Sequence, residues 1–210
     1  IGCAPKRFPS TWLYNKLKKT YTTQELLDSG LIQKVGFKNE DEEKIIDVHS
    51  ESLIIPYLSN SQVVDVYGRR LKAEKEWRHM RLSGETKEPL YFDKAHRHSR
   101  IILLEGEINL LIMKALGYKE SMGTQGTNGL NLNHIKLLKE VRAQSKNQWC
   151  NTIYIMYDGD EAGLKAAEKI GEVLIKEGFE VFVVLLPKDL DVNDISKKHK
   201  KEAKNKIDNL

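Results

Sequence analysis

The second half of the chain alternates short apolar runs with longer stretches in which apolar residues recur at helical spacing. The runs at 101–104, 152–157 and 180–186 are typical of strands that are buried on both faces. Helical patterns cover 108–116, 131–144 and 161–176, and a glycine follows closely after the first and the third. This alternation predicts an α/β fold with a parallel sheet and helices on its faces.

The first hundred residues have a different pattern. Residues 10–30 predict two short helices, with Ser10 and either Thr22 or Thr23 as N-caps. Residues 38–51 carry eight charges and little apolar pattern, which indicates an exposed loop. Extended segments at 52–58 and 62–67 flank a turn at 59–61 and predict a hairpin, and a third extended segment is expected at 77–82.

The change of pattern near Arg100 predicts a domain boundary there. We expect a basic, mixed α/β subdomain with an antiparallel hairpin at 1–100 and an α/β domain at 101–195. Residues 196–210 are rich in lysine and predict a charged C-terminal helix or linker, largely solvated.

The composition excludes several classes of protein. No stretch approaches the ~20 apolar residues that a membrane span needs, and residues 1–10 lack the apolar core of a secretory signal. Two cysteines, Cys3 and Cys150, are too few for a disulfide scaffold or a four-cysteine zinc module, and they indicate a reducing compartment. We therefore expect a cytoplasmic protein that has no membrane partner.

Charge is unevenly distributed along the chain. The formal net charge is +4; residues 1–100 sum to +4 and residues 101–210 to zero. Residues 66–100 contain ten basic and five acidic residues, among them Arg69, Arg70, Arg78 and Arg81. This segment suits a bound polyanion, although taken alone it equally describes a solvated surface of mixed charge.

Carboxylates follow two of the predicted parallel strands. Glu105 comes directly after the first strand, and Asp158 and Asp160 follow the second, with only Gly159 between them. The carboxyl ends of parallel strands share one edge of a sheet, where ligands bind. Carboxylates gathered there repel one another unless a cation joins them, and hard oxygen ligands favour Mg²⁺ or Mn²⁺. The sequence thus predicts a metal site for phosphodiester chemistry; the alternative role for either aspartate is an ordinary helix N-cap.

Two further aspartates follow the third predicted strand. Asp191 and Asp194 stand where another metal ligand is expected, and either could instead cap the terminal helix. The glycine-rich stretch 123–129, which includes Gly126, predicts a loop that allows close approach of a nucleic acid, or a flexible connection only.

In this order, these residues resemble the Toprim domain that DnaG-type primases, topoisomerases and some nucleases share. The resemblance covers residues 100–195. Four segments look like those of bacterial and phage primases: Glu105-Gly106-Glu107-Ile108, Asp158 to Ala167, Gly123 to Thr127, and Pro187 with Asp191 to Asp194. The first half is similar to the start of a primase RNA polymerase domain, with Val66 to Arg70 in its basic hairpin. The length is closest to compact primases of phages and mobile elements.

The resemblance implies synthesis of RNA primers on single-stranded DNA from nucleoside triphosphates, with a replicative helicase as a partner, in the bacterial cytoplasm or that of a phage host. It implies Glu105, Asp158 and Asp160 as catalytic and metal-binding residues with Mg²⁺ or Mn²⁺, helped by Asp191 and Asp194. It implies nucleotide or DNA contacts by Arg69, Arg70, Arg78, Arg81 and Gly126.

One position departs from the family pattern: Asn109 replaces an aspartate four residues after Glu105. A second metal would then bind more weakly. The alternatives are a metal-dependent Toprim nuclease and a catalytically weak module that binds single-stranded DNA or a helicase.

Overall fold

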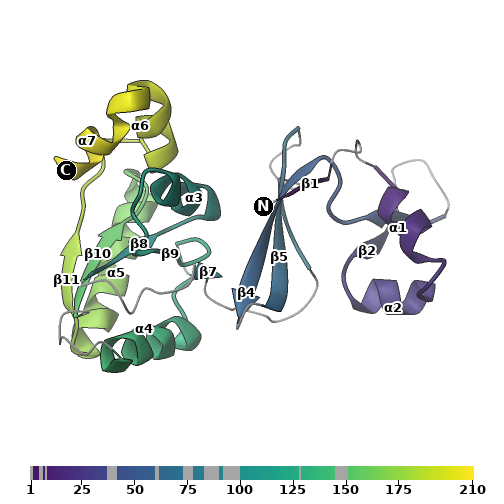
Figure 1. Cartoon of the computed structure of the whole chain (residues 1–210), viewed down its shortest axis with the longest axis horizontal. Coiled ribbons are helices and arrows are strands. Elements are labelled where there is room, and N and C mark those ends of the chain that lie inside the picture. The colour runs from purple at the N-terminus through teal and green to yellow at the C-terminus, as the bar shows by residue number, and fades with distance from the viewer. Residues whose placement is uncertain are drawn as a thin grey trace. The chain divides into compact units, whose positions relative to one another are not determined.

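The computed structural model describes residues 2–4, 7, 9–36, 42–59, 62–72, 78–82, 90–91, 100–127, 129–144 and 151–210. The chain divides into two compact units, residues 1–86 and 87–210 (Figure 1). Within the described ranges, no helix has the length and apolar character needed to cross a membrane.

The described residues of the first unit form two antiparallel sheets and two short helices. The larger sheet has the order β1-β4-β5-β6 and the smaller one pairs β2 with β3. Its elements are β1 (Gly2–Ala4), α1 (Trp12–Leu17), α2 (Thr23–Asp28), β2 (Ile32–Val35), β3 (Lys44–Asp47), β4 (Ser52–Ser59), β5 (Gln62–Arg70) and β6 (His79–Arg81). The predicted helices and the β4–β5 hairpin are confirmed, whereas the tip of the hairpin, residues 60–61, lies outside the described residues.

Two predictions for this unit need correction. Ser10 lies one residue before the N-cap of α1, Thr11, and its hydroxyl accepts the N–H of Trp12 at 3.1 Å. The N–H groups of Leu13 and Tyr14 donate to the Asp47 carboxylate, each at 2.9 Å. The described part of 38–51 is not a loop, because β3 pairs with β2 and buries Ile46, leaving it 1% exposed. The sequence did not indicate this strand because its only two apolar residues, Ile45 and Ile46, lie between charged residues.

The second unit is built on a five-stranded sheet with the order β11-β10-β8-β9-β7. Strands β8 to β11 are parallel and β7 is antiparallel to β9. Its elements are β7 (Leu90–Tyr91), β8 (Arg100–Leu104), α3 (Glu107–Ala115), β9 (Ser121–Gly123), α4 (Leu132–Gln144), β10 (Thr152–Met156), α5 (Glu161–Lys176), β11 (Glu180–Val183), α6 (Val192–His199), the 3₁₀ helix η3 (Lys200–Glu202) and α7 (Ala203–Asp208). The predicted fold class is confirmed. The boundary expected at residue 100 stays a prediction.

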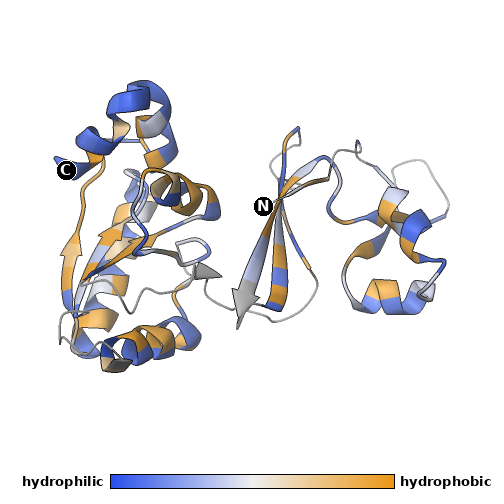
Figure 2. Cartoon of the chain, viewed as in Figure 1, coloured by the Kyte–Doolittle hydropathy of each residue, from blue (hydrophilic) through white to orange (hydrophobic). Residues whose placement is uncertain are grey.

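The centre of the sheet is buried on both faces because β8 is apolar at every position after Arg100 (Figure 2). Ile101 and Leu103 of β8 pack with Ile153 and Ile155 of β10 against α4 and α5. Side chains alternate along a strand, so Ile102 and Leu104 point to the other face, and α3 packs against β8 and β9.

The path of the chain through this sheet creates a ligand-binding edge. From β8 the chain passes through α3 to β9 on one side, then through α4 to β10 on the other side of β8. Open α/β sheets bind ligands where the connections change direction in this way, at the carboxyl ends of the strands. Helices α6 and α7 lie beyond that end of the sheet (Figure 1).

Candidate active site at the carboxyl edge of the parallel sheet

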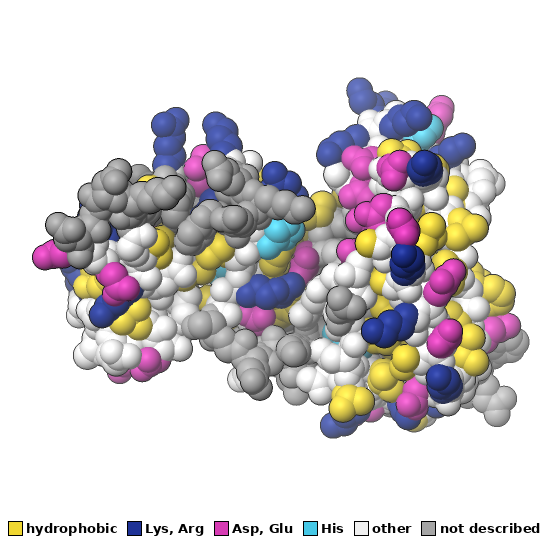
Figure 3. Space-filling view, turned by 180° about the vertical axis from the view of Figure 1, so that it is seen from behind, with side chains coloured by type: hydrophobic (Ala, Val, Ile, Leu, Met, Phe, Trp, Pro, Cys, Tyr) yellow, Lys and Arg dark blue, Asp and Glu magenta, His cyan; other side chains and the backbone are white. Residues whose placement is uncertain are grey.

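Glu105 and Asp158 lie together at the switch point of the sheet. Leu104 is in register with Met156, so the residues that follow these strands leave the sheet at the same level. The backbone N–H of Asp158 acts to lower the pKa of the Glu105 carboxyl group, against the larger effects that raise it. Figure 3 shows acidic side chains gathered on one side of this unit, between apolar and lysine-rich surface.

The electrostatics of this pair reflect burial and like charge. Partial burial, and then the charges of Asp158 and Asp160, raise the pKa of Glu105 to about 7. Partial burial, and then the charges of Asp191 and Asp160, raise the pKa of Asp158 to about 6. Both carboxylates therefore sit among uncompensated negative charge, an arrangement that favours a bound cation.

Asp160 is exposed and acts as the N-cap of α5. Its Oδ1 accepts a hydrogen bond from the N–H of Gly163 at 2.7 Å. The capping role that the sequence left open is therefore present, and a metal-binding role for Asp160 stays a prediction.

Asp191 and Asp194 form a capping box at the start of α6. Oδ1 of Asp191 accepts the N–H of Asp194 at 2.7 Å, and Oδ2 of Asp194 accepts the N–H of Asp191 at 3.5 Å. Burial and the charge of Asp194 raise the pKa of Asp191, although the N–H of Asp194 acts in the opposite direction. The charges of both residues raise the pKa of Asp158, but each carboxylate already accepts a backbone N–H, and their metal-binding role stays a prediction.

Asn109 occupies the centre of this arrangement and is 5% exposed. Its side-chain N–H donates to Oδ1 of Asp158 at 2.9 Å, while its carbonyl accepts the N–H of Asn193 at 3.3 Å. Asn109 thus connects α3, the loop after β10 and α6 without adding a charge.

Gly159 lies between the two aspartates because the neighbouring backbone leaves no room for a side chain. A Cβ atom here would lie 2.3 Å from the carbonyl oxygen of Pro187. The N–H of Gly159 donates to the carbonyl of Leu190 at 2.8 Å, and its own carbonyl accepts the N–H of Asp189 at 3.0 Å. Close backbone packing, rather than an unusual φ, therefore requires glycine at this position.

The loop after β9 is hydrogen-bonded to the backbone of Glu105 and of Leu104 before it. The N–H of Gly126 donates to the carbonyl of Glu105 at 2.7 Å, and the N–H of Thr124 donates to the carbonyl of Leu104 at 2.9 Å. The Thr124 hydroxyl is also hydrogen-bonded to the hydroxyl of Tyr157, the residue before Asp158. One threonine therefore joins the ends of both strands that carry the acids.

Sequence reasoning did not single out Thr124 and Tyr157. Their positions in the sequence could have identified them, because Thr124 directly follows a strand of three residues and Tyr157 directly precedes Asp158. Gly126, predicted to contact nucleic acid, has a φ of +103° and positions Glu105 through its N–H. Its role in binding stays a prediction.

The carboxylates share an edge without forming a closed ligand shell. Among the described residues, no three His, Cys, Asp or Glu side chains are grouped closely enough to hold a metal ion by themselves. The donor set nevertheless fits Mg²⁺ or Mn²⁺, because these ions prefer oxygen ligands and usually bind one or two carboxylates together with waters and substrate phosphates.

The four predicted arginines belong to the first unit and differ in exposure. Arg78 is exposed, and Arg69 is half-buried with Nη1 2.7 Å from Nε2 of His79. Arg81 donates to the hydroxyl of Tyr57 at 2.9 Å and lies over the rings of Tyr57 and Tyr67.

Arg70 requires a correction. It is 2% exposed, and its guanidinium donates to the carbonyls of Ser50 at 3.2 Å and Val48 at 3.0 Å. Arg70 therefore holds the chain before β4 in place, and we remove it from the set of nucleotide-binding candidates.

Comparisons with known proteins agree with this geometry. Residues 102–196 match the Toprim-like family model. The chain is 28% identical to the DNA primase of Staphylococcus epidermidis over 213 residues, covering 96% of this chain and 33% of that protein. It is also 28% identical to the DNA primase of Staphylococcus aureus over 196 residues, covering 89% and 30%. The chain thus spans about a third of the length of these relatives.

Solved structures show the same likeness over the whole chain. The Aquifex aeolicus primase, with its zinc-binding and RNA polymerase domains, matches with a TM-score of 0.75 at 25% identity, covering 99% of this chain and 50% of that one. The RNA polymerase domain of Mycobacterium tuberculosis primase DnaG matches with a TM-score of 0.73 at 21% identity, covering 98% and 68%.

Residues 102–196 are therefore similar to the Toprim-like family. The whole chain shares its fold with solved primase RNA polymerase domains and is similar in sequence to bacterial DNA primases.

Proposed function

We propose that this chain is the catalytic core of a DNA primase, which joins ribonucleoside triphosphates into a short RNA primer on single-stranded DNA. The observation that carries the proposal is the meeting of Glu105 and Asp158 at the switch point of a Toprim-like sheet, within a fold shared with primases over the whole chain. One of the matched structures is a DnaG primase catalytic domain bound to single-stranded DNA, which supports this choice of template.

The reaction needs a base for the primer 3′-hydroxyl and compensation for the charge of the triphosphate. Glu105, whose pKa is raised to about 7, is suited to accept that proton near neutral pH. The 3′-oxygen then bonds to the α-phosphorus of the incoming nucleotide, the bond to the bridging oxygen breaks, and pyrophosphate leaves. Positioning and charge neutralisation dominate such transfers.

Asp158 would hold Mg²⁺ or Mn²⁺, with Asp160, Asp191 and Asp194 as further oxygen donors. When bound, the ion supplies positive charge to the phosphate oxygens. Asn109 keeps Asp158 oriented and favours its ionised form, because the amide N–H donates to Oδ1. Arg69, Arg78 and Arg81 are the proposed contacts of the first unit with phosphate, since guanidinium groups suit phosphate geometry.

The test is incorporation of labelled ribonucleotides on single-stranded DNA with Mn²⁺ or Mg²⁺, with the DNA labelled separately. We expect primer products that disappear in Asp158→Ala and fall at least ~100-fold in Glu105→Gln, the range for loss of a general base. Asp189→Asn, two residues before the capping box of α6, is the matched acid-to-amide control and should retain activity. Degradation of the DNA without incorporation would overturn the proposal in favour of the nuclease, and DNA binding without either reaction would favour a non-catalytic module.

We further propose that the protein works in the bacterial cytoplasm, or in the host cell if a phage encodes it, together with a replicative helicase. The bacterial primases among its relatives support this setting. Stimulation of primer synthesis by the cognate helicase would test the partnership, and unchanged synthesis over a range of helicase concentrations would count against it.

A further inference from the structure

The C-terminal helices carry a concentrated positive charge. Residues 195–210 contain six lysines against Glu202 and Asp208, which gives a net charge of +4, whereas residues 101–194 sum to −4. All six lysines, Lys197, Lys198, Lys200, Lys201, Lys204 and Lys206, are exposed. We call them the C-terminal lysine surface. Figure 3 shows basic side chains at this end of the second unit, beside the acidic ones.

This surface is fixed to the second unit by buried apolar residues. Val192 and Ile195 of α6 are 0% and 2% exposed, and Ala203 and Ile207 of α7 are 0% and 5% exposed. The expected solvated helix is therefore solvated on one side only. Lys200, with a φ of +46°, marks the break that turns the chain from α6 into η3 and α7.

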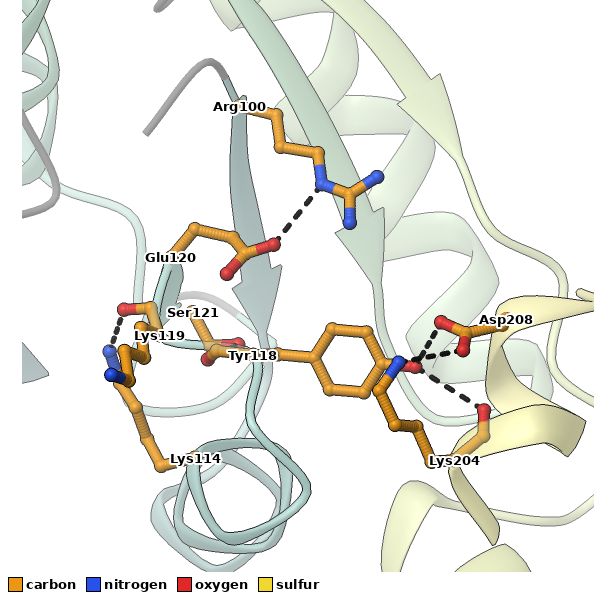
Figure 4. A network of polar contacts seen from close by, with 8 residues as sticks. All are labelled: Arg100, Lys114, Tyr118, Lys119, Glu120, Ser121, Lys204 and Asp208. Carbon is orange, nitrogen blue, oxygen red and sulfur yellow. Dashed lines mark hydrogen bonds and ion pairs between the residues drawn. The ribbon is translucent and has the colours of Figure 1, made fainter. Parts of the chain in front are cut away.

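Tyr118, in the loop after α3, locks α7 in place (Figure 4). Its hydroxyl donates to Oδ1 of Asp208 at 2.5 Å and to the carbonyl of Lys204 at 3.3 Å. The Lys204 ammonium lies 4.7 Å from the centre of the Tyr118 ring and pairs with Asp208 at 2.7 Å. Lys204 is the only one of the six lysines in an ion pair within the described part of the chain, so most of the positive charge faces solvent.

Helix α6 connects the acidic edge of the sheet, at its N-terminus, with the C-terminal lysine surface. It begins at its N-cap Asp191 and ends among Lys197, Lys198 and His199. At 1.5 Å per residue, Asp191 and Lys198 are about 10 Å apart along the helix axis.

The chemistry of the surface fits phosphate better than protein. The apolar residues of α6 and α7 face inward, and only Leu210, at 45% exposure, is a large exposed apolar side chain in this region. Protein interfaces are centred on aromatic or aliphatic anchors and are poor in lysine. Binding to a nucleic-acid backbone needs only closely spaced cations.

We propose that the C-terminal lysine surface binds the phosphate backbone of single-stranded nucleic acid and holds it beside the acidic edge. The choice of single-stranded nucleic acid as the ligand rests on the proposed primase function. Binding itself requires neither Glu105 nor Asp158, so it is measured without divalent ions and independently of synthesis.

The experiment measures binding of a fluorescent single-stranded DNA by anisotropy, in chelator, from 50 to 200 mM salt. The variant is Lys197→Gln/Lys198→Gln/Lys200→Gln/Lys201→Gln. The matched control is Lys136→Gln/Lys165→Gln/Lys169→Gln/Lys176→Gln, which removes the same charge from exposed positions on α4 and α5. Glutamine preserves helix propensity, and circular dichroism checks that both variants fold.

We expect the C-terminal variant to lose at least ~10-fold in affinity at 100 mM salt and the control to change less than about 2-fold. The slope of log affinity against log salt should become shallower by about 3, because each lost phosphate contact on a single strand contributes about 0.7. Equal affinities and slopes for the two variants would overturn the proposal. Competition by poly-glutamate as effective as that by unlabelled DNA would also overturn it, in favour of an acidic protein partner.

The outcomes separate this proposal from the proposed function. If the wild-type protein makes no primer but the C-terminal variant loses DNA binding, the lysine surface is supported and the primase activity is contradicted. If the wild-type protein makes primers and the C-terminal variant binds DNA as tightly as wild type, the primase activity is supported and the lysine surface is contradicted.

Discussion

The side-chain amide of Asn109 donates a 2.9 Å hydrogen bond to Oδ1 of Asp158, and its carbonyl accepts the N–H of Asn193. An aspartate at position 109 could accept from Asn193 but could not donate to Asp158. It would place a second negative charge beside a carboxyl group whose pKa the neighbouring acids already raise. Asparagine therefore stabilises the ionised Asp158 where an aspartate would depend on a cation to do so.

Asn109→Asp should accordingly lower stability in chelator by about 1–3 kcal/mol, because a donated hydrogen bond gives way to like-charge repulsion. It should also increase the stabilisation by Mn²⁺, because the variant adds a charged oxygen donor. Thermal unfolding in chelator and over a Mn²⁺ series measures both effects. Asn109→Ala is the control, since it loses the bonds without gaining a charge. A variant as stable as wild type in chelator would contradict the interaction.

Gly159→Ala should destabilise the second unit by about 1–3 kcal/mol, since overpacking of this size is typical when backbone must shift. The added Cβ would lie 2.3 Å from the carbonyl oxygen of Pro187 and 3.0 Å from that of Leu190. Gly106→Ala is the matched control, with no atom within 4 Å of its Cβ, and should cost about 1 kcal/mol or less, as at an N-cap. Urea unfolding compares the two. Equal losses would show that the contact with the 186–190 loop is not limiting.

Thr124 and Tyr157 should be energetically coupled, because their hydroxyls are bonded and both are buried. Thr124→Val keeps the shape but leaves the Tyr157 hydroxyl unpaired, at a cost of about 1–3 kcal/mol. Tyr157→Phe should cost less, since Thr124 keeps the Leu104 carbonyl as a partner at 3.2 Å. The double variant should then be more stable than the sum of the single losses by about 0.5–1.5 kcal/mol in a double-mutant cycle. Simple additivity would contradict the link between the two strand ends.

His49 should make the first unit sensitive to mild acid. It is 8% exposed, and burial followed by the charge of Arg70 lowers its pKa from 6.5 to about 4. As pH falls, the unfolded chain therefore takes up the proton first. Stability is intact above about pH 6.5 and is lost progressively down to about pH 4, by about 3 kcal/mol in total.

Urea unfolding between pH 7.5 and 4.5 measures this loss in wild type and in His49→Gln. The variant lacks the titrating group, so its free energy of unfolding should fall by about 2–3 kcal/mol less over this range. Comparing slopes cancels any constant cost of the substitution. Parallel pH dependences in the two proteins would contradict the assignment.

Much of the second unit could be predicted because its signals are local. The apolar runs that become β8 and β10 are buried on both faces, and the acids that follow them fall on one edge for purely topological reasons. Strand β9 could not be recognised in this way. It has three residues, one of them Ser121, and its identity depends on pairing with β8 and β7.

The first unit was harder to predict because its key contacts are between residues distant in sequence. Arg70 is chemically suited to phosphate, yet it is bonded to carbonyls about twenty residues earlier. No spacing rule separates it from Arg69, its neighbour. The uses of Asp160 and Asp191 as caps could be foreseen as alternatives, but only the positions of Gly163 and Asp194 decide that both caps form.

The capping of α1 by Asp47 has a consequence for how the protein assembles. A helix of six residues is far below the ~12–15 that isolated helices need, and its cap lies 33 and 34 residues further along the chain. Residues 12–17 therefore leave the ribosome well before the group that stabilises them. We infer that β2 and β3 pair first, and that α1 forms on the carboxylate which this pairing brings into place.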